Sequence, residues 1–384
     1  MSGFASSEFA PSEPELREAV RALTGSATAR VLSWQRSPVD WRVVSEVTGG
    51  LHRLSGTLED GGTLQPWSLV VKVNRRPPGD GKTDEAAWRR EELSYTSGIL
   101  RPRGGFAMAR CLAVTRLSAE ETWLWLEDVR DEGGALWSLN RHTAAARHLG
   151  LLNGTHRVVP GRALDWLFGG WLEQLTPLGN DEASAGLRRP EVEVWDHPLV
   201  FPEPVLAQLE RLSEAAPHLH RELSAVPHAL CHLDPGQFNL CSRTRADGTR
   251  ETVFLDWHTL SLGALGTDLA MMNALNLCRL YVRSEEAESY SDATLAAYLG
   301  GLREAGLNAS LAEVCRAYTV LAALRAGAII RVLVHALVAD EAKQTWPSAW
   351  GTRLGLGRNE ALQAWGRNMR FLLFLHEPLP PWKG

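Results

Sequence analysis

The sequence predicts an α+β protein in which a β-rich N-terminal lobe precedes a mostly helical C-terminal lobe. In the first part of the chain, β-branched and alternating apolar runs are separated by glycine turns, a pattern typical of antiparallel strands. The second part contains long stretches with helical apolar periodicity. Because the pattern changes at residues 127–133, we expect one lobe at 1–130 and the other at 131–384.

The N-terminal lobe is expected to begin with a helix from Ser12 to about Leu23. Ser12 and Glu15 form a capping box, and Pro14 suits the first helical turn. About five antiparallel strands and one inserted helix should follow. The strands are predicted at residues 41–47, 51–58, 67–73, 109–116 and 122–126, and the helix at 84–97. Turns are expected at Gly49-Gly50 and at residues 59–62.

The C-terminal lobe is predicted to be built mainly from helices. These are expected at residues 139–153, 204–215, 268–281, 292–305, 310–337 and 358–374. The most apolar long segment, 318–338, carries Arg325, Arg331 and His335. Such a composition favours a buried helix over a membrane span.

Composition narrows the class of protein. Of 384 residues, 45% are hydrophobic and 22% are charged, and the net charge of −5 disfavours a dedicated nucleic-acid binder. A local basic cleft stays possible, because net charge says nothing about distribution. Five cysteines in no zinc or CxxC pattern indicate free thiols in a reducing compartment. No signal-peptide pattern is present, so we expect a cytoplasmic protein. We also expect a monomer or homodimer that has neither a membrane nor a nucleic acid as a partner.

The segments 231–240 and 253–257 carry the chemistry-bearing residues. Asp234 and Asn239 lie five residues apart, and Asp256 follows a short apolar strand after a polar, hairpin-like stretch at 243–252. Phosphoryl transfer needs a base or orienter for the acceptor hydroxyl, and an amide oxygen and a carboxylate that hold Mg²⁺. Taken alone, the Asp234–Asn239 spacing is more typical of a turn than of a site, because Asp, Gly and Asn are common in turns. Asp256 favours a metal site over a turn, because a carboxylate at the end of an apolar run is costly unless it is paired or metal-bound.

Lys72 lies in a strand that has apolar residues on both faces. A lone buried ammonium is costly unless it meets an anion, and the following helix offers Glu91 and Glu92. The alternative is an edge lysine that reaches solvent. Gly49 and Gly50 would let backbone amides approach a phosphate, but a plain hairpin turn explains them equally well.

Together these residues resemble the aminoglycoside phosphotransferase and choline kinase superfamily, whose members are small-molecule kinases with a protein-kinase-like fold. The matching motifs follow one order over residues 40–270. They are Gly49-Gly50, Lys72, Glu91 in an E-x-x-x-Y helix, Glu127-Asp128-Val129, His232-x-Asp234-x-x-x-x-Asn239, Asp256-Trp257 and Asp268-Leu269-Ala270.

The resemblance implies a two-lobe fold and an enzyme that uses ATP and Mg²⁺. Lys72, paired with Glu91, would hold the α- and β-phosphates. The backbone of Glu127, Asp128 and Val129 would contact adenine. Asp234 would be the catalytic base or orienter, and Asn239 and Asp256 would ligate Mg²⁺.

Three departures from the family pattern concern the same motifs. Leu233 stands where the family has glycine in H-G-D. Residues 235–238 differ from the common polar-His/Asn-Pro-Gly segment, although the spacing from Asp234 to Asn239 is kept. The Gly49-Gly50 turn is also short for a phosphate lid.

We therefore expect a phosphotransferase that acts on a hydroxyl of a small polar acceptor of aminoglycoside, choline or sugar type. The alternative is a catalytically weak or inactive nucleotide-binding scaffold or sensor of the same fold. His232 is expected to fix the loop, and Asp268 to cap a helix or orient the loop. For the acceptor, the acidic candidates are Glu191, Glu193, Asp196 and Asp268, and the stacking candidates are Trp195, Trp257 and His258; a solvated loop explains the acidic residues equally well.

Overall fold

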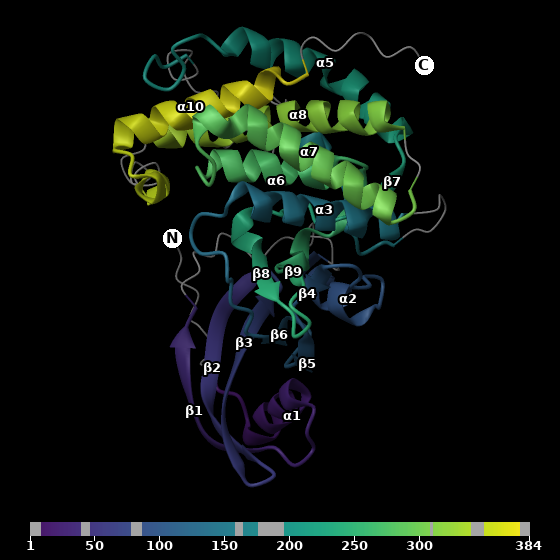
Figure 1. Ribbon diagram of the computed structural model, residues 1–384, viewed down its shortest axis with the longest axis vertical. Coiled ribbons are helices and arrows are strands. Elements are labelled where there is room, and N and C mark those ends of the chain that lie inside the picture. The colour runs from purple at the N-terminus through teal and green to yellow at the C-terminus, as the bar shows by residue number, and fades with distance from the viewer. Residues whose placement is uncertain are drawn as a thin grey trace. The chain divides into compact units, whose positions relative to one another are not determined.

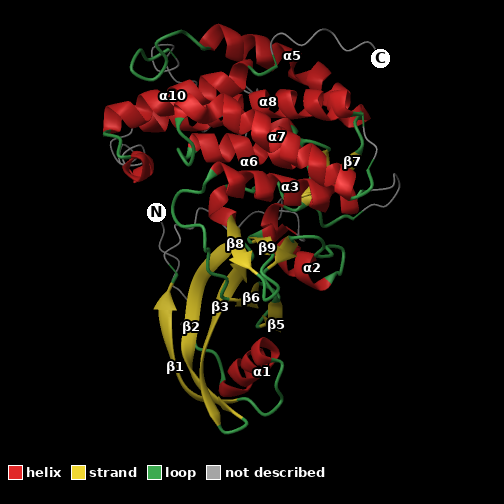
Figure 2. Cartoon of the chain, viewed as in Figure 1, coloured by secondary structure: helices red, strands yellow, loops and turns green. Residues whose placement is uncertain are grey.

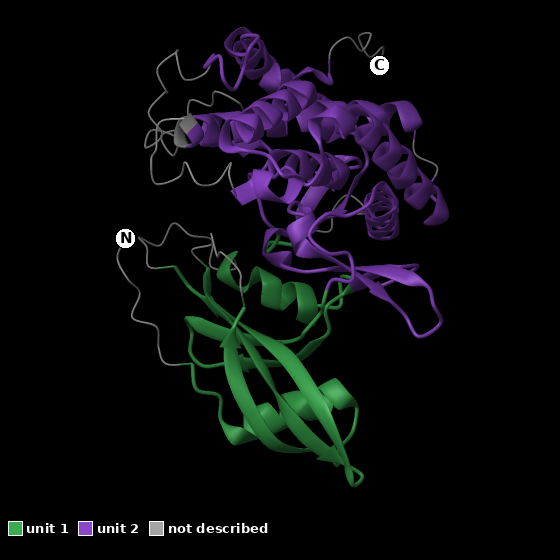
Figure 3. Ribbon diagram, turned by 60° about the vertical axis from the view of Figure 1, so that its left-hand side comes forward, with its two compact units in different colours: residues 1–101, 108–130, 164–167 green, residues 102–107, 131–163, 168–384 purple. Residues whose placement is uncertain are grey.

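The computed structural model describes residues 9–39, 47–77, 87–157, 164–175, 196–307, 310–338 and 349–376. The chain divides into two compact units (Figure 3). Unit 1 comprises residues 1–101, 108–130 and 164–167, and unit 2 comprises 102–107, 131–163 and 168–384. Strands dominate unit 1 and helices dominate unit 2 (Figure 2), so the predicted α+β class is confirmed.

Unit 1 contains a five-stranded antiparallel sheet. Its strands are β1 (Arg30–Pro38), β2 (Thr48–Asp60), β3 (Thr63–Arg75), β5 (Cys111–Arg116) and β6 (Glu121–Glu127), in the order β1-β2-β3-β6-β5. The turn between β2 and β3 is the predicted glycine pair. Gly61 and Gly62 have φ of 58° and 80°, a left-handed conformation that glycine adopts without steric cost.

One face of this sheet packs against helix α1 (Glu13–Thr24). The helix begins with the predicted capping box, in which Ser12 N–H donates to Glu15 Oε2 at 2.8 Å. The shared core takes alternate residues of each strand, as the pleat requires: Leu54 and Leu58 of β2, Trp67, Leu69, Val71 and Val73 of β3, and Trp123 and Trp125 of β6. Lys72 therefore points to the opposite face of β3.

Two N-terminal assignments are wrong, and a third lies mostly outside the described residues. β1 was not predicted, because this edge strand is largely exposed and shows no apolar alternation. Gly49 and Gly50 form no hairpin turn, since both lie inside β2, where the register against β3 shifts between Thr48 and Gly50. Of the strand predicted at 41–47, residues 41–46 are outside the described part of the chain.

Helix α2 (Arg90–Thr96) is shorter than the predicted helix at 84–97. A 3₁₀ turn, Ala87–Arg89, precedes it, and the first predicted residues, 84–86, are not among those described. The chain leaves the helix at Gly98, which has φ of 67° and ends it as expected.

Unit 2 is built around α6 (Thr267–Cys278), every residue of which is buried. Around it pack α3 (Leu139–Thr155), α7 (Ala287–Glu304), α8 (Leu311–Val338) and α10 (Arg358–Phe374), as Figure 1 shows. The predicted helix at 204–215 is observed as α5 (Leu206–Ala225). The helix is longer than predicted, since it continues beyond residue 215 and contains Pro217.

Two small sheets in unit 2 place the motif segments. β7 (His228–Cys231) pairs with β10 (Ser261–Ala264), and β4 (Phe106–Met108), β9 (Arg250–Phe254) and β8 (Leu240–Thr244) form the second sheet. β8 and β9 are the two arms of the predicted polar hairpin. The loop between β7 and β8 carries Asp234 and Asn239, and Asp256 follows β9.

α8 contains a segment, Leu311–Val334, that is apolar and long enough to cross a membrane by length and composition. Core helices pass the same test, and 72% of its most apolar stretch is buried inside the protein. This supports the prediction of a buried helix. The cysteines also agree with expectation: all five are free, and Cys231, Cys241 and Cys278 are buried.

Candidate active site

In unit 1, Lys72 and Glu91 form a buried ion pair. Lys72 Nζ lies 2.7 Å from Glu91 Oε2, and the two side chains are only 6% and 1% exposed. The pair joins β3 to α2 on the face of the sheet opposite α1. A charge pair this deep is costly to desolvate, and removing one partner would leave the other uncompensated.

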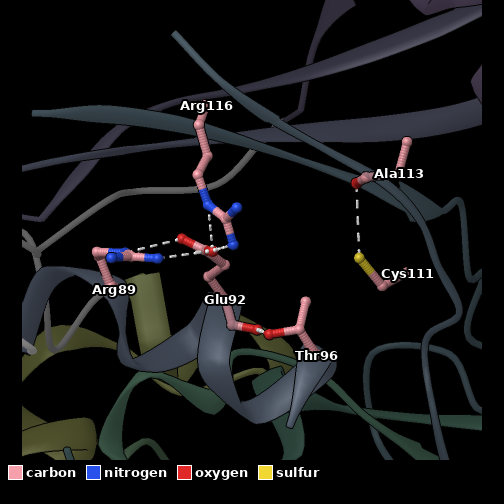
Figure 4. Close-up of polar contacts among 6 residues, drawn as sticks. All are labelled: Arg89, Glu92, Thr96, Cys111, Ala113 and Arg116. Carbon is pink, nitrogen blue, oxygen red and sulfur yellow. Dashed lines mark hydrogen bonds and ion pairs between the residues drawn. The ribbon is translucent and has the colours of Figure 1, made fainter. Parts of the chain in front are cut away.

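Glu92, the other candidate partner of Lys72, is neutralised elsewhere. Its carboxylate accepts hydrogen bonds from Arg89 at 3.1 Å and from Arg116 Nε at 2.8 Å (Figure 4). Although burial opposes ionisation, these two guanidinium groups hold the pKa of Glu92 below its ordinary value. The same view shows the Cys111 thiol donating to the Ala113 carbonyl at 3.6 Å. The structure thus pairs Lys72 with Glu91, the glutamate that the E-x-x-x-Y resemblance favoured, and gives Glu92 to the two arginines.

The segment Glu127-Asp128-Val129 follows β6 and is held by its own contacts. The Asp128 carboxylate accepts from Arg53 Nε at 2.9 Å and from the Ser68 hydroxyl. Val129 N–H donates to the Glu127 carbonyl at 3.0 Å. These contacts fix the segment, and its assignment to adenine stays a prediction. The same is true of phosphate binding by Gly49 and Gly50.

In unit 2, the loop after β7 brings Asp234 and Asn239 into direct contact. Asn239 Nδ2 donates to Asp234 Oδ2 at 2.8 Å and to the Asp234 carbonyl at 2.9 Å. A short 3₁₀ turn, Gln237–Asn239, turns the Asn239 side chain back toward the loop. The spacing of five residues therefore allows the Asn239 side chain to hydrogen-bond back to Asp234 within the same loop.

Asp256 lies near this pair. It follows β9 in a left-handed conformation, with φ of 58°, and its Oδ1 lies 3.7 Å from His258 Nδ1. Burial, followed by the negative charge of Asp256, raises the pKa of Asp234 to about 6. Two carboxylates that oppose each other's ionisation form a site that a cation would stabilise.

Asn239 supplies the observation that tests this cation site. It is fully buried, and its Oδ1 has no hydrogen-bond partner among the described residues. Its Nδ2 is already engaged by Asp234, so the free atom is the oxygen that a hard cation requires. At nucleotide-binding sites Mg²⁺ is bound by one or two protein carboxylates, with phosphate and water completing its shell. The donor set therefore fits Mg²⁺, although no group of three His, Cys, Asp or Glu side chains suited to a metal occurs in the described chain.

His232 fixes the backbone of the loop. It is fully buried, its Nε2 faces the Leu255 carbonyl at 2.8 Å, and its Nδ1 accepts from Asp234 N–H at 3.3 Å. Burial lowers the pKa of His232, so the neutral ring with a proton on Nε2 satisfies both contacts. Its ring packs 4.6 Å from that of Trp257. Because Trp257 is fully buried in this contact, it is not available as a stacking wall for an acceptor.

Asp268 orients the loop and does not cap its helix. It lies in the first turn of α6 behind the N-cap Gly266. Its carboxylate accepts from His232 N–H at 3.1 Å and from Leu233 N–H at 2.9 Å. Asn153 Nδ2 on α3 adds a third hydrogen bond at 2.9 Å. Asp268 is fully buried, which excludes it from binding an acceptor directly.

Leu233 adopts the conformation for which the family pattern has glycine. Its φ is 63°, and its side chain is buried at 7% exposure. A left-handed leucine is strained by about 1–2 kcal/mol relative to glycine. The loop geometry is therefore kept despite the substitution, and burial of the leucine side chain offsets its strain.

Two asparagines that the sequence analysis did not assign support the same loop. Asn153 joins Asp268 to β7, since its Nδ2 also donates to the Leu230 carbonyl at 2.8 Å. Asn276 of α6 accepts from Gln237 N–H at 2.7 Å. A polar residue on an otherwise apolar helix face was the available signal for both.

Of the remaining acceptor candidates, Asp196 and His258 lie among the described residues. Asp196 Oδ1 accepts from Val205 and Leu206 N–H groups at 2.9 and 3.2 Å, and so fixes the start of α5. His258 is half-buried beside Asp256. Glu191, Glu193 and Trp195 lie outside the described residues.

Comparison with known proteins places these motifs in a family. The family model of the phosphotransferase enzyme family matches residues 57–307, a segment that contains both the Lys72–Glu91 pair and the Asp234 loop. A search of curated proteins gave no match.

Several solved structures are similar to the chain. One is amicoumacin kinase in complex with AMP-PNP, Ca²⁺ and Ami, with 14% identity over 91% of this chain and 96% of that one, and a TM-score of 0.49. Another is Plasmodium vivax ethanolamine kinase, with 12% identity over 84% and 82% and a TM-score of 0.45. A third is spectinomycin phosphotransferase in complex with ADP and spectinomycin, with 13% identity over 88% and 94% and a TM-score of 0.43.

The family assignment rests on the sequence match, which covers more than half of the 384 residues. Within the matched segment, the structure shows the buried lysine–glutamate pair and the hydrogen-bonded aspartate–asparagine loop. The chain belongs to the phosphotransferase enzyme family.

Proposed function

We propose that the protein is an ATP- and Mg²⁺-dependent kinase that phosphorylates a hydroxyl of a small polar molecule. The observation that carries the proposal is the Asn239 side chain. Its Nδ2 holds the Asp234 carboxylate at 2.8 Å, which leaves its buried Oδ1 without a partner among the described residues. A base, an amide oxygen and a second carboxylate are the groups that nucleotide-dependent phosphoryl transfer requires.

In this mechanism Asp234 is the group that receives the proton. The acceptor oxygen forms a bond to the γ-phosphorus of ATP, the bond from that phosphorus to the bridging oxygen breaks, and ADP leaves with the electron pair. The hydroxyl proton passes to Asp234, whose pKa of about 6 leaves it ionised at neutral pH yet more basic than an ordinary aspartate.

Other residues position this chemistry. Asn239 and Asp256 would hold Mg²⁺, which offsets phosphate charge when it is bound. In unit 1, Lys72 would bind the α- and β-phosphates, and Glu91 fixes its ammonium group at 2.7 Å. Asp268 sets the position of the loop through the backbone amides of His232 and Leu233. Most of the rate enhancement would come from orientation and electrostatic stabilisation.

The test begins with a screen of sugars, amino alcohols and aminoglycosides for ADP release. With the acceptor found, Asp234→Ala should lower turnover by about two to four orders of magnitude, the range for loss of a general base. Asp247→Ala is the matched control, because Asp247 is an exposed carboxylate of unit 2 that bonds only Thr249 in its own turn. Mass spectrometry of the acceptor should show one added phosphoryl group.

Two results would contradict this proposal. Wild-type turnover in Asp234→Ala would remove Asp234 from the chemistry. Stabilisation of the fold by Mg-ATP, with no phosphorylated product from any acceptor, would instead identify the nucleotide-binding scaffold or sensor.

A further inference from the structure

Two arginines of unit 2 lie close to the Asp234 loop. Arg279 directly follows α6, and its Cζ lies 3.8 Å from the ring centroid of Phe238, which stands between Asp234 and Asn239 in the sequence. Arg325 lies near the middle of α8. The side chain of Arg325 is half-buried, and its Nε is shielded from solvent with no hydrogen-bond partner among the described residues.

In the part of the chain that the structure describes, neither arginine forms a salt bridge, and the carboxylate that acts on Arg325 from beyond ion-pair distance is that of Asp234. Both arginines nevertheless act on Asp234 electrostatically, since each lowers its pKa against the opposing effects of burial and Asp256. A shielded guanidinium nitrogen without an acceptor is costly unless a ligand completes it.

The acidic acceptor candidates that the structure describes are already engaged, so they do not offer a free negative charge to a cationic acceptor. Asp268 is fully buried and bonded to the loop amides, and Asp196 is bonded to the start of α5. Asp234 and Asp256 belong to the catalytic and metal groups. In the proposed function Mg²⁺ takes up the charge of Asp256 and Asp234 faces the hydroxyl, which leaves the two arginines as the charged groups beside the loop; arginine is the side chain best suited to bind a carboxylate or phosphate.

We propose that the acceptor carries an anionic group, a carboxylate or a phosphate, near its reactive hydroxyl, and that Arg279 and Arg325 bind this group. The inference rests on the proposed function, because it takes Asp234 as the group that faces the hydroxyl. Phe238 holds the Arg279 guanidinium in place by stacking, and Arg325 presents its unpartnered nitrogen from the core of unit 2.

The test uses four alcohols that differ mainly in charge: glycerate, glycerol 3-phosphate, glycerol and 3-amino-1,2-propanediol. Wild-type protein with Mg-ATP should release ADP with at least one anion at a kcat/KM about tenfold or more above glycerol and the amine, as loss of one charged hydrogen bond implies. Comparison of glycerate with glycerol 3-phosphate decides between a carboxylate and a phosphate. Thermal shift of the Mg-ADP complex with the same four compounds measures binding without turnover.

Variants separate acceptor binding from nucleotide binding. Arg325→Gln and Arg279→Gln should each raise the acceptor KM about tenfold while the KM for ATP stays unchanged. Arg325→Lys keeps the charge and should recover part of the loss. Arg303→Gln, which removes an exposed arginine from α7, is the control for a simple change in net charge.

Three results would overturn the inference. They are equal or better use of the amine, a rise in the KM for ATP instead of the acceptor, and no effect of either anion in both assays. Its failure differs from failure of the proposed function. If neutral or cationic alcohols are phosphorylated and Asp234→Ala abolishes this, only the anionic acceptor is wrong. If Mg-ATP binds and no alcohol of any charge is phosphorylated, the proposed function fails as well.

Discussion

The Lys72–Glu91 pair of unit 1 is buried and the carboxylates of the Asp234 loop of unit 2 are half-buried, and the two sites balance charge in opposite ways. In the first, an ammonium and a carboxylate neutralise each other at 2.7 Å. In the second, Asp234 and Asp256 repel each other, and Asn239 keeps an unpartnered oxygen. The pair in unit 1 is complete without a ligand, whereas the loop in unit 2 keeps an unpartnered oxygen and two carboxylates that a cation would stabilise.

In the proposed function the two sites would make different contributions. A self-neutralised pair contributes to the stability of unit 1 and holds a lysine in one position. An unbalanced cluster weakens unit 2 until its ligand arrives, and it is therefore where binding energy is available. Each expected outcome below tests one side of this contrast.

The largest expected effect is on the balanced pair. Lys72→Met leaves the Glu91 carboxylate buried without its ammonium, and we expect a loss of about 3–5 kcal/mol in the free energy of unfolding. Urea unfolding followed by tryptophan fluorescence measures this loss. In the double variant Lys72→Met with Glu91→Leu, both charges are absent, so most of the stability should return. A double variant as unstable as the single one would show that the pair is not self-contained.

A smaller loss is expected from the carboxylate that holds the loop. Asp268→Asn replaces one accepting oxygen by an amide that faces donors, so stability should fall by about 1–3 kcal/mol. Turnover should fall with it, because the amides of His232 and Leu233 lose their common anchor. Asp292→Asn on the exposed face of α7 serves as the control. Unchanged turnover in Asp268→Asn would remove the orienting role.

The unbalanced cluster should show itself in pH dependence. The pKa of Asp234 in the folded protein, about 6, lies above its ordinary value of 3.8. The folded state therefore favours the protonated acid, and stability from this group is present at low pH and lost as pH rises from about 4 to about 6. Asp234→Asn should be more stable than wild type at pH 8 and not at pH 4. A pH-independent difference between the two proteins would contradict the raised pKa.

Activity should follow the same ionisation. Since Asp234 accepts the proton only when it is ionised, kcat/KM of the free enzyme should fall on acidification below pH about 6.

The smallest expected effect is at Leu233. Leu233→Gly relieves a strain of about 1–2 kcal/mol but removes a buried side chain of similar value, so stability should change by about 1 kcal/mol or less. Turnover should stay close to wild type. Leu233→Val is the matched contrast, because a β-branched residue is least tolerant of positive φ. Equal stability of the two variants would mean that φ at this position is not the constraint.

Sequence reasoning was strongest where a charged residue broke an apolar pattern. Lys72 stood out because it lies in a strand with apolar residues on both faces, and Asp256 stood out at the end of β9. Where exposure erased the pattern, as in the edge strand β1, the prediction failed. Gly49 and Gly50 were misassigned because a glycine pair is compatible both with a turn and with an irregular strand register.

Contacts between distant segments were beyond the reach of sequence pattern. Asn153 and Asp268 are separated by 115 residues, and their hydrogen bond depends on how α3 packs against α6. The pairing of Glu92 with Arg89 and Arg116 likewise was not predicted, because Arg116 lies 24 residues away on β5. The position of Arg325 near Asp234 follows from the packing of α8 on α6, which no local periodicity specifies.

The anchoring of the Asp234 loop to α6 has a consequence for its motion. The amides of His232 and Leu233 are bonded to a carboxylate on a helix whose residues are all buried. These two amide protons can meet solvent only when that helix opens, so they should be among the slowest of the chain to exchange with deuterium. Although this loop has no regular secondary structure, its amides would then exchange as slowly as those of α6, the fully buried helix of unit 2.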